Sequence, residues 1–342
     1  MVTVQQGGVV VGRDEGSASE AGRSSGGRWG RLGRPLKPVL VATALGLAAF
    51  LLYRALRRYD LDQVIYSVTS IPLDHLALAG AFAAASYLCL TGFDALALRY
   101  VGRPLPYRQA ATASFVALSI GHNIGFAALS SGAIRYRFYS KWGLSAQAVG
   151  KLILFCALTV GLGLMILGGA ALLWQPDLAA EMTRLDRPLV LMLGTACLGL
   201  ALVYLALAAF VRRLRFRRWH LEMPRFRLAV GQVIIGPLNF ACVAACLHQA
   251  LAALSEVAYP GVAAAYVIAN VTALITHVPG GLGVIEGVVM FLLPEGNIIG
   301  ALLVFRFVYF LVPLCLGSLL FAGIELAGRR RTGRRASDAA RP

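Results

Sequence analysis

Charged residues are scarce in this sequence, since Asp, Glu, Lys and Arg together make up 14% of its 342 residues. Soluble globular domains carry about 25% charged residues. The chain is 58% hydrophobic, its mean hydropathy is +0.71, and residues 152–174 and 189–211 contain no charge at all. Each of these runs is long enough for the roughly 20 helical residues that cross a bilayer. The scarcity of charge therefore excludes a soluble domain and predicts an all-α polytopic membrane protein.

Paired cysteines and catalytic motifs are also missing. The six cysteines all lie in apolar segments and none has a second pair at metal-ligand spacing, which excludes a disulfide framework and a zinc site. The run "GGLGVIEG" (280–287) lacks the third glycine, in register, of a nucleotide-binding loop. No nucleophile elbow or ATP-binding motif is visible. We therefore expect a protein that is not an enzyme and that holds no cofactor or metal.

Acidic residues are half as numerous as basic ones, 16 against 32, which gives a net charge of +16. The arginines cluster in the N-terminal tail, in residues 212–227 and in residues 328–335, beside apolar segments. Basic residues beside spans face the cytoplasm and anionic lipid, so this charge does not predict a nucleic-acid partner. We expect residues 1–36 to be a disordered basic cytoplasmic tail, residues 37–327 a transmembrane domain and residues 328–342 a second basic cytoplasmic tail.

The charge of the loops limits how the apolar segments can cross the membrane. Loops 175–188 and 254–260 are acidic and predicted to be external, whereas loop 212–227, with seven arginines, is predicted to be cytoplasmic. If every apolar segment crossed once, the most basic loop would lie outside. The conflict disappears if two of the segments dip into the bilayer and return on the same side. The apolar segments fall at 38–54, 75–98, 109–128, 148–174, 189–211, 228–254, 261–278, 282–294 and 297–326.

Two regions have the helix breakers that such hairpins need. "SIGHNIGF" (119–126) interrupts residues 109–134, and "THVPGGLG" (276–283) interrupts residues 261–294. One hairpin would open from inside and the other from outside, which is typical of an inverted repeat around a binding site. We therefore predict about six to eight transmembrane helices, including two broken re-entrant hairpins in an inverted-repeat arrangement. Eight full spans are the main alternative.

The second break predicts a site for an anion. A half-helix beginning near Leu282 would present free N–H groups and the positive end of its dipole, and a lipid phosphate is the obvious anion at that depth. The backbone of Gly280, Gly281 and Gly283 would form this end. Glu286 would lie just past the first turn of the half-helix, available to a cationic group or to an arginine.

Charged residues inside a membrane usually have a partner or a function, because their insertion costs at least ~2.5–3.5 kcal/mol each. Each candidate here also has a structural interpretation. Asp94 could pair with Arg99 or Arg103 at the interface. Arg135, Arg137 and Lys141 could be ordinary cytoplasmic anchors. Glu286 and Arg306 could neutralise each other as an ion pair and still contact substrate. The candidates for substrate binding are Asp94, Arg135, Arg137, Glu286 and Arg306.

Three further polar residues, His122, Asn123 and His277, lie at the two predicted breaks and could line a polar cavity. A single histidine on an apolar segment is more often a hydrogen-bonded core residue than a proton relay. These residues are therefore weaker candidates than the charged ones.

Three runs, "GAIRYRFYSKWGLS", "HVPGGLGVIEGVV" and "FRFVYFLVPLCLG", resemble the transmembrane flippase region of the lysylphosphatidylglycerol synthetase/flippase family. The resemblance covers roughly residues 60–325 and extends to the shorter, stand-alone members, which are bacterial inner-membrane proteins. It implies a multi-pass protein of the bacterial cytoplasmic membrane, and the basic tails predict that both termini are cytoplasmic. Because no room remains after residue 342 for the aminoacyl-transferase domain, it implies lipid translocation rather than lipid synthesis. By their position in these motifs, the five charged candidates match polar residues of the family's membrane region.

The leading hypothesis is translocation of a phospholipid or aminoacylated phospholipid between leaflets. The partner would be an anionic phospholipid headgroup, with or without an aminoacyl group, which a half-helix end and one or more arginines would hold. The alternative is a non-transporting accessory or scaffold protein for a separate lipid- or glycan-modifying enzyme. A third hypothesis, a small-solute transporter, differs from the first in having a cavity that is closed to lipid at its sides.

Overall fold

The computed structural model describes residues 66, 69–124, 127–211, 213–216, 219–293 and 298–338. The first tail and the first span that the sequence predicts, at 1–36 and 38–54, lie outside these residues. Helices dominate the described chain, because in hydrocarbon a helix satisfies its backbone hydrogen bonds internally. They are α3 (Leu73–Tyr100), α4 (Tyr107–Ile124), α5 (Ala127–Lys141), α6 (Ala146–Trp174), α7 (Pro176–Thr183), α8 (Arg187–Phe210), α9 (Phe226–Ala252), α10 (Tyr259–Thr276), α11 (Val284–Leu292), α12 (Ile298–Arg306) and α13 (Val312–Asp338).

Three short elements complete the list. A 3-10 turn, η1 (Pro279–Gly281), lies between α10 and α11, and a π-helical turn, η2 (Phe307–Leu311), joins α12 to α13. Strands β1 (Arg213–Phe216) and β2 (Trp219–Glu222) form an antiparallel ribbon between α8 and α9. Neither this ribbon nor α7 was predicted from the sequence, because both lie in segments that were expected to be loops.

Six of the described helical segments are long and apolar enough to cross a membrane: α3, α6, α8, α9, α10 and the continuous segment 298–327. The prediction of an all-helical polytopic protein is therefore confirmed. Segments α4, α5 and α11, three of the four arms of the predicted hairpins, are not among the six, whereas the fourth arm, α10, is long and apolar enough to cross. Entry of the two hairpins from opposite faces stays a prediction.

Both predicted helix breaks are present. The first separates α4, which ends at Ile124, from α5, which begins at Ala127. The second separates α10, which ends at Thr276, from α11, which begins at Val284. In each case the two arms pack against each other, so the chain forms helical hairpins at both places.

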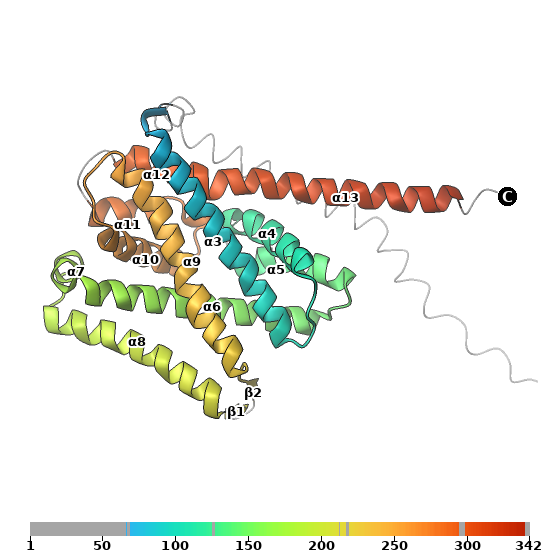
Figure 1. Cartoon of the computed structure of the whole chain (residues 1–342), viewed down its shortest axis with the longest axis horizontal. Coiled ribbons are helices and arrows are strands. Elements are labelled where there is room, and N and C mark those ends of the chain that lie inside the picture. The colour runs from blue at the N-terminus through green and yellow to red at the C-terminus, as the bar shows by residue number, and fades with distance from the viewer. Residues whose placement is uncertain are drawn as a thin grey trace, which may run out of the picture. The chain divides into compact units, whose positions relative to one another are not determined.

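Glycine allows close contact between the helices that surround these hairpins. A Cβ added to Gly163 on α6 would lie 2.6 Å from the backbone of Gly236 on α9, and one added to Gly121 on α4 would lie 2.8 Å from Ser131 Cβ on α5. Small residues at such crossings let helix backbones approach in membranes, where packing replaces the hydrophobic effect as the driving force. In Figure 1, α3 and α9 lie side by side and α6 lies next to α8.

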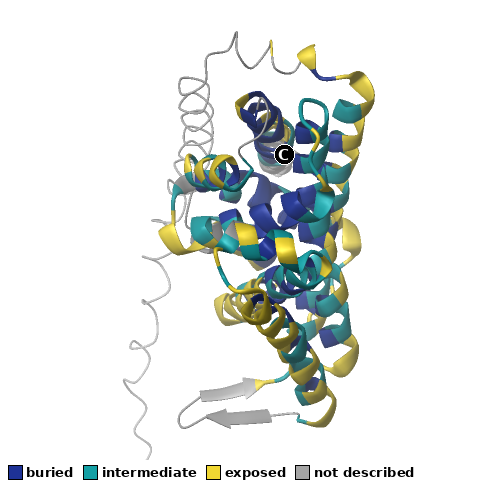
Figure 2. Ribbon diagram, turned by 90° about the vertical axis from the view of Figure 1, so that its left-hand side faces the viewer, coloured by how far each residue is buried: buried dark blue, intermediate teal, exposed yellow. Residues whose placement is uncertain are grey.

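The helices differ strongly in how far they are covered. The most apolar window of the last span, 298–327, is 78% buried, whereas that of α8 is 17% buried. Figure 2 shows dark blue, buried ribbon concentrated in the middle of the helices and yellow, exposed residues along the outer ones. An apolar helix with so little protein cover is expected to face lipid.

Candidate functional site

The site is built around the second helix break. His277 has a left-handed backbone (φ 53°), and so do Gly280, Gly281 and Gly283 (φ 60°, 58° and 81°). The positive φ of Gly281 favours glycine there, and an added Cβ would also lie 2.9 Å from the end of the Ile285 side chain, which would have to move. At Gly280 an added Cβ would lie 3.6 Å from the carbonyl oxygen of His122, on the first hairpin. The two breaks therefore lie against each other.

Arg306 fastens the second break to the last span. Its guanidinium donates to both carboxylate oxygens of Glu286, at 2.6 Å from Nε and 3.0 Å from Nη2, and to the carbonyl oxygens of Gly280 and Gly281. The guanidinium carbon lies 4.6 Å from the centre of the Phe310 ring. Arg306 is 4% exposed. The structural ion pair left open by the sequence is thus present, whereas substrate contact by either residue stays a prediction.

Glu286 itself occupies the N-terminus of half-helix α11. The helix begins at Val284 rather than near Leu282, so Glu286 is its third residue. Its Oε2 accepts a hydrogen bond from the Gly283 N–H at 2.8 Å. The chain's own carboxylate therefore binds one N–H group at this helix end, and binding of a phosphate by the other N–H groups stays a prediction.

A second buried ion pair joins the first hairpin to α3. Arg135 on α5 donates to Asp94 from Nε at 2.9 Å and from Nη2 at 2.7 Å, and Tyr139 OH donates to the same carboxylate at 2.6 Å. Arg135 Nη1 donates to Ser131 Oγ at 3.0 Å. Asp94 is fully buried. The proposed pairing of Asp94 with an arginine at the end of its own helix is therefore wrong, because α5 packs a bidentate partner directly against it.

Arg137 lies on the same helix but at a different place. It donates to Glu325 on α13, with 2.8 Å between Arg137 Nη2 and Glu325 Oε2, and Lys141 lies 3.1 Å from the same carboxylate. The side chains of Arg137 and Glu325 are 15% and 12% exposed. These contacts tie α5 to the last helix, and Arg137 does not line the cavity described next.

A cavity of about 470 Å³ lies between the two breaks. Arg135, Gly280 and Gly281 line it, whereas Asp94, Glu286 and Arg306 do not. Residues of both hairpins therefore line the cavity, but only some of the predicted site residues are among them. Its polar lining consists of the side chains of His122, Ser131, Arg135, Asn239, Tyr266, Asn270, His277 and Tyr309.

The three weaker candidates divide in the same way. His122 and His277 line the cavity. Asn123 does not, because its Nδ2 donates to the Ser119 carbonyl oxygen one turn earlier, at 2.9 Å. Two further lining residues are linked through Ser86: Tyr309 OH lies 3.0 Å from Ser86 Oγ, which donates to Asn239 Oδ1 at 2.7 Å.

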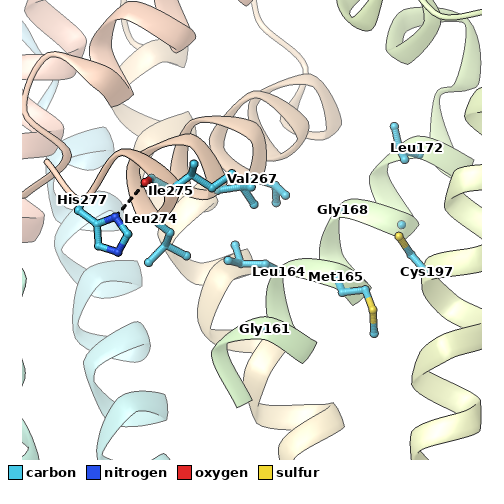
Figure 3. A pocket seen from close by; sticks show the side chains of 12 residues that line it. Gly161, Leu164, Met165, Gly168, Leu172, Cys197, Val267, Leu274, Ile275 and His277 are labelled. Carbon is cyan, nitrogen blue, oxygen red and sulfur yellow. Dashed lines mark hydrogen bonds between the residues drawn. The ribbon is translucent and has the colours of Figure 1, made fainter. Parts of the chain in front are cut away.

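An apolar groove of about 790 Å³ lies next to this cavity. Helices α6, α8 and α10 form it, and Figure 3 shows Leu164, Cys197 and Val267 among its walls. Gly161, Leu274 and His277 line both the groove and the cavity, so the two spaces meet at these residues. The groove is open to the outside, in contrast to a closed core cavity.

Sequence reasoning missed several residues of the site. Ser131 and Tyr139 lie four residues before and after Arg135, on one helix face, and this spacing could have identified both. Asn239 and Asn270 are amides within apolar helices, which is also a readable signal. Glu325 is an acidic residue near the end of the last span. It was overlooked because it lies just before the basic run 328–335.

These features define a polytopic helical membrane protein in which two broken hairpins enclose a polar cavity with an open apolar side. Residues 39–317 match the family described as Lysylphosphatidylglycerol synthase TM region, and the chain belongs to this family. The resemblance stated from the three sequence runs is therefore confirmed.

Two relatives resemble the chain over most of their length. The uncharacterized protein slr0712 of Synechocystis is 32% identical over 287 residues, which is 82% of this chain and 89% of that protein. The inner membrane protein YbhN of Escherichia coli is 28% identical over 257 residues, 72% of this chain and 78% of that protein. The name of the second agrees with the prediction of a multi-pass inner-membrane protein.

Proposed function

We propose that this protein moves a phospholipid between the two leaflets of the membrane and is not an enzyme. The observation that carries the proposal is the junction between the polar cavity and the open apolar groove at Gly161, Leu274 and His277. A phospholipid has a polar headgroup and apolar chains joined at one point. The two spaces offer one environment for each part, in contact with each other.

The barrier to unassisted movement is the transfer of the headgroup into hydrocarbon, where its polar groups lose their hydrogen bonds. In the cavity, Arg135, Asn270 and the two histidines replace water as partners for the headgroup. The acyl chains meanwhile stay in the apolar groove, next to lipid. The protein would therefore lower the barrier without covering the whole lipid.

Family membership supports a role with lipid, since the family's description names a lipid synthase and its membrane region. The open groove favours a lipid over a small solute, whose transporter needs a cavity closed at its sides. In the absence of an ATP-binding motif, movement would run downhill or be coupled to an ion gradient. An accessory role for a separate enzyme would leave lipid movement unchanged when the purified protein is added.

The test uses the purified full chain in liposomes that carry a fluorescent phospholipid in both leaflets. A membrane-impermeant quencher measures how fast the inner-leaflet label reaches the outside. We expect faster exchange with protein than in protein-free liposomes. Equal rates, together with co-purification of the protein with an enzyme, would replace the transport proposal with the accessory role.

A blocking variant tests the route. At Gly161 an added Cβ meets nothing within 4 Å, so Gly161→Leu would fill the junction without disturbing the packing of α6. Gly150→Leu, also on α6 and also open, is the matched control because Gly150 lines neither space. We expect the first variant to slow exchange about tenfold or more and the second to leave it unchanged. Equal rates in both variants would refute this route.

A further inference from the structure

The charge of the cavity lining selects the headgroup. Of the described residues that line the cavity, none is Asp or Glu. The lining contains a guanidinium, two imidazoles, two amides and three hydroxyl groups, which include strong hydrogen-bond donors and no side chain that carries a negative charge at neutral pH. Such a surface can neutralise an anion, but it offers a cation no counter-charge.

The two carboxylates predicted as site residues, those of Asp94 and Glu286, bind partners within the protein. Asp94 has no exposed surface and receives hydrogen bonds from Arg135 and Tyr139. Glu286 binds Arg306 with both oxygens and caps α11 through the Gly283 N–H. Their charges are therefore compensated inside the protein, and neither reaches the cavity.

Of the Asp94–Arg135 ion pair, only the arginine belongs to the cavity lining. Arg135 lines the cavity and Asp94 does not, so the positive end of the pair faces the space. The described chain occupies three of the five guanidinium N–H groups, two toward Asp94 and one toward Ser131. The other two N–H groups have no partner among the described residues, and Arg135 lines the cavity that a ligand oxygen would enter. A guanidinium edge with two donors is a suitable partner for a phosphate.

Backbone acceptors near the second break are also engaged. A cationic ammonium group could bind to carbonyl oxygens in place of carboxylates. However, the Gly280 and Gly281 carbonyl oxygens, which belong to lining residues, accept hydrogen bonds from Arg306. An ammonium group would therefore stand near a second arginine with only neutral amide and hydroxyl oxygens as acceptors and no counter-charge, and burying an unpaired charge is strongly unfavourable.

We infer that the headgroup accepted by this cavity is an anionic phosphate diester without an attached cationic group, and that aminoacylated, cationic headgroups are excluded. This inference rests on the proposed lipid movement and specifies its substrate class. It also separates the chain from the cationic lipid that the family's description names. Arg135 is the residue that would bind the phosphate.

The test compares three fluorescent lipids with identical acyl chains in liposomes that contain the full protein: phosphatidylglycerol, zwitterionic phosphatidylethanolamine and lysylphosphatidylglycerol. We expect phosphatidylglycerol to exchange about tenfold or more faster than lysylphosphatidylglycerol, with phosphatidylethanolamine between them. Equal or faster exchange of the lysyl lipid would overturn the inference while the proposed function stands. If none of the three exchanges, the proposed function fails. Uptake of radioactive inorganic phosphate without lipid exchange would also overturn the lipid assignment.

A charge introduced into the cavity provides a second measurement. Asn270 lines the cavity and donates to Tyr266 OH at 3.0 Å, so Asn270→Asp adds a carboxylate with almost no change in shape. We expect this variant to slow phosphatidylglycerol and to accelerate the lysyl lipid, which narrows or reverses their ratio. Asn270→Leu is the control of similar size without charge and should not favour the lysyl lipid. An unchanged ratio in a folded Asn270→Asp variant would contradict the inference.

Discussion

Asp94→Asn is expected to destabilise the protein strongly, because it leaves the guanidinium of Arg135 buried without a counter-ion. The amide also presents two N–H donors where the carboxylate accepted from Arg135 at 2.7 and 2.9 Å and from Tyr139 at 2.6 Å. At least one donor must then face another donor. Removing one partner of a buried ion pair costs about 3–5 kcal/mol. This is a large part of the ~5–15 kcal/mol by which domains are typically stable.

The free energy of unfolding can be measured by titrating a denaturing detergent into mild micelles and following tryptophan fluorescence. Trp142 reports on this region, since its ring centre lies 6.0 Å from that of Tyr139. Asp177→Asn makes the same chemical change in an exposed pair with Arg187, 3.2 Å apart, and should cost about 0–1 kcal/mol. Adding Arg135→Gln to Asp94→Asn should cost much less than the sum of the two single changes. A cost for Asp94→Asn as small as that of the control would refute the reasoning.

Three further predictions concern the hairpins and their supports. Gly281→Ala should lower the free energy of unfolding by about 1–3 kcal/mol because of its positive φ and its close neighbour, whereas Gly287→Ala, with open space on α11, should leave thermal unfolding unchanged or raise its midpoint slightly. Gly163→Leu should prevent α6 from approaching α9 and give aggregated protein in size-exclusion chromatography, and a monodisperse product would contradict this. Glu325→Gln removes the partner of two cations on α5 and should accelerate amide hydrogen exchange near the C-terminal end of α5, while equal exchange would show that the ion pairs do not hold it.

The apolar helices could be predicted closely from the sequence. Residues 148–174 were expected and α6 covers Ala146–Trp174, and residues 189–211 were expected and α8 covers Arg187–Phe210. Agreement within two residues follows from hydrocarbon thickness, which sets a length, and from Gly, Pro and charge, which mark the ends. The short helix α7 and the β1–β2 ribbon lie outside the apolar segments, where no such constraint operates.

The partners of the charged residues were harder to predict. Asp94 and Arg135 are 41 positions apart, and composition cannot say which of several nearby arginines α5 will place against α3. The ion pair of Glu286 and Arg306 was foreseen because the two lie 20 positions apart, in neighbouring segments with few other charges. The sequence did not indicate that Glu286 and Arg306 are absent from the cavity lining. Which residues line the cavity depends on which side of each helix faces the neighbouring hairpin.

The ion pairs explain how helices too short or too polar to cross a membrane stay at membrane depth. The first hairpin is fastened to α3 through Asp94, and α11 is fastened to α12 through Arg306. Each pair is bidentate, and a separation of its members inside the protein would expose an unpaired charge to a low dielectric. A movement that opens the cavity should therefore keep each hairpin together with its supporting helix. Between the tips, near His122 and Gly280, the described contact is van der Waals in character. No charge pair among the described residues joins these two tips, but Glu325 on α13 holds the first hairpin to the same span that carries Arg306. A movement between the tips must therefore be accommodated within that span, where the π-helical turn η2 separates Arg306 from Glu325.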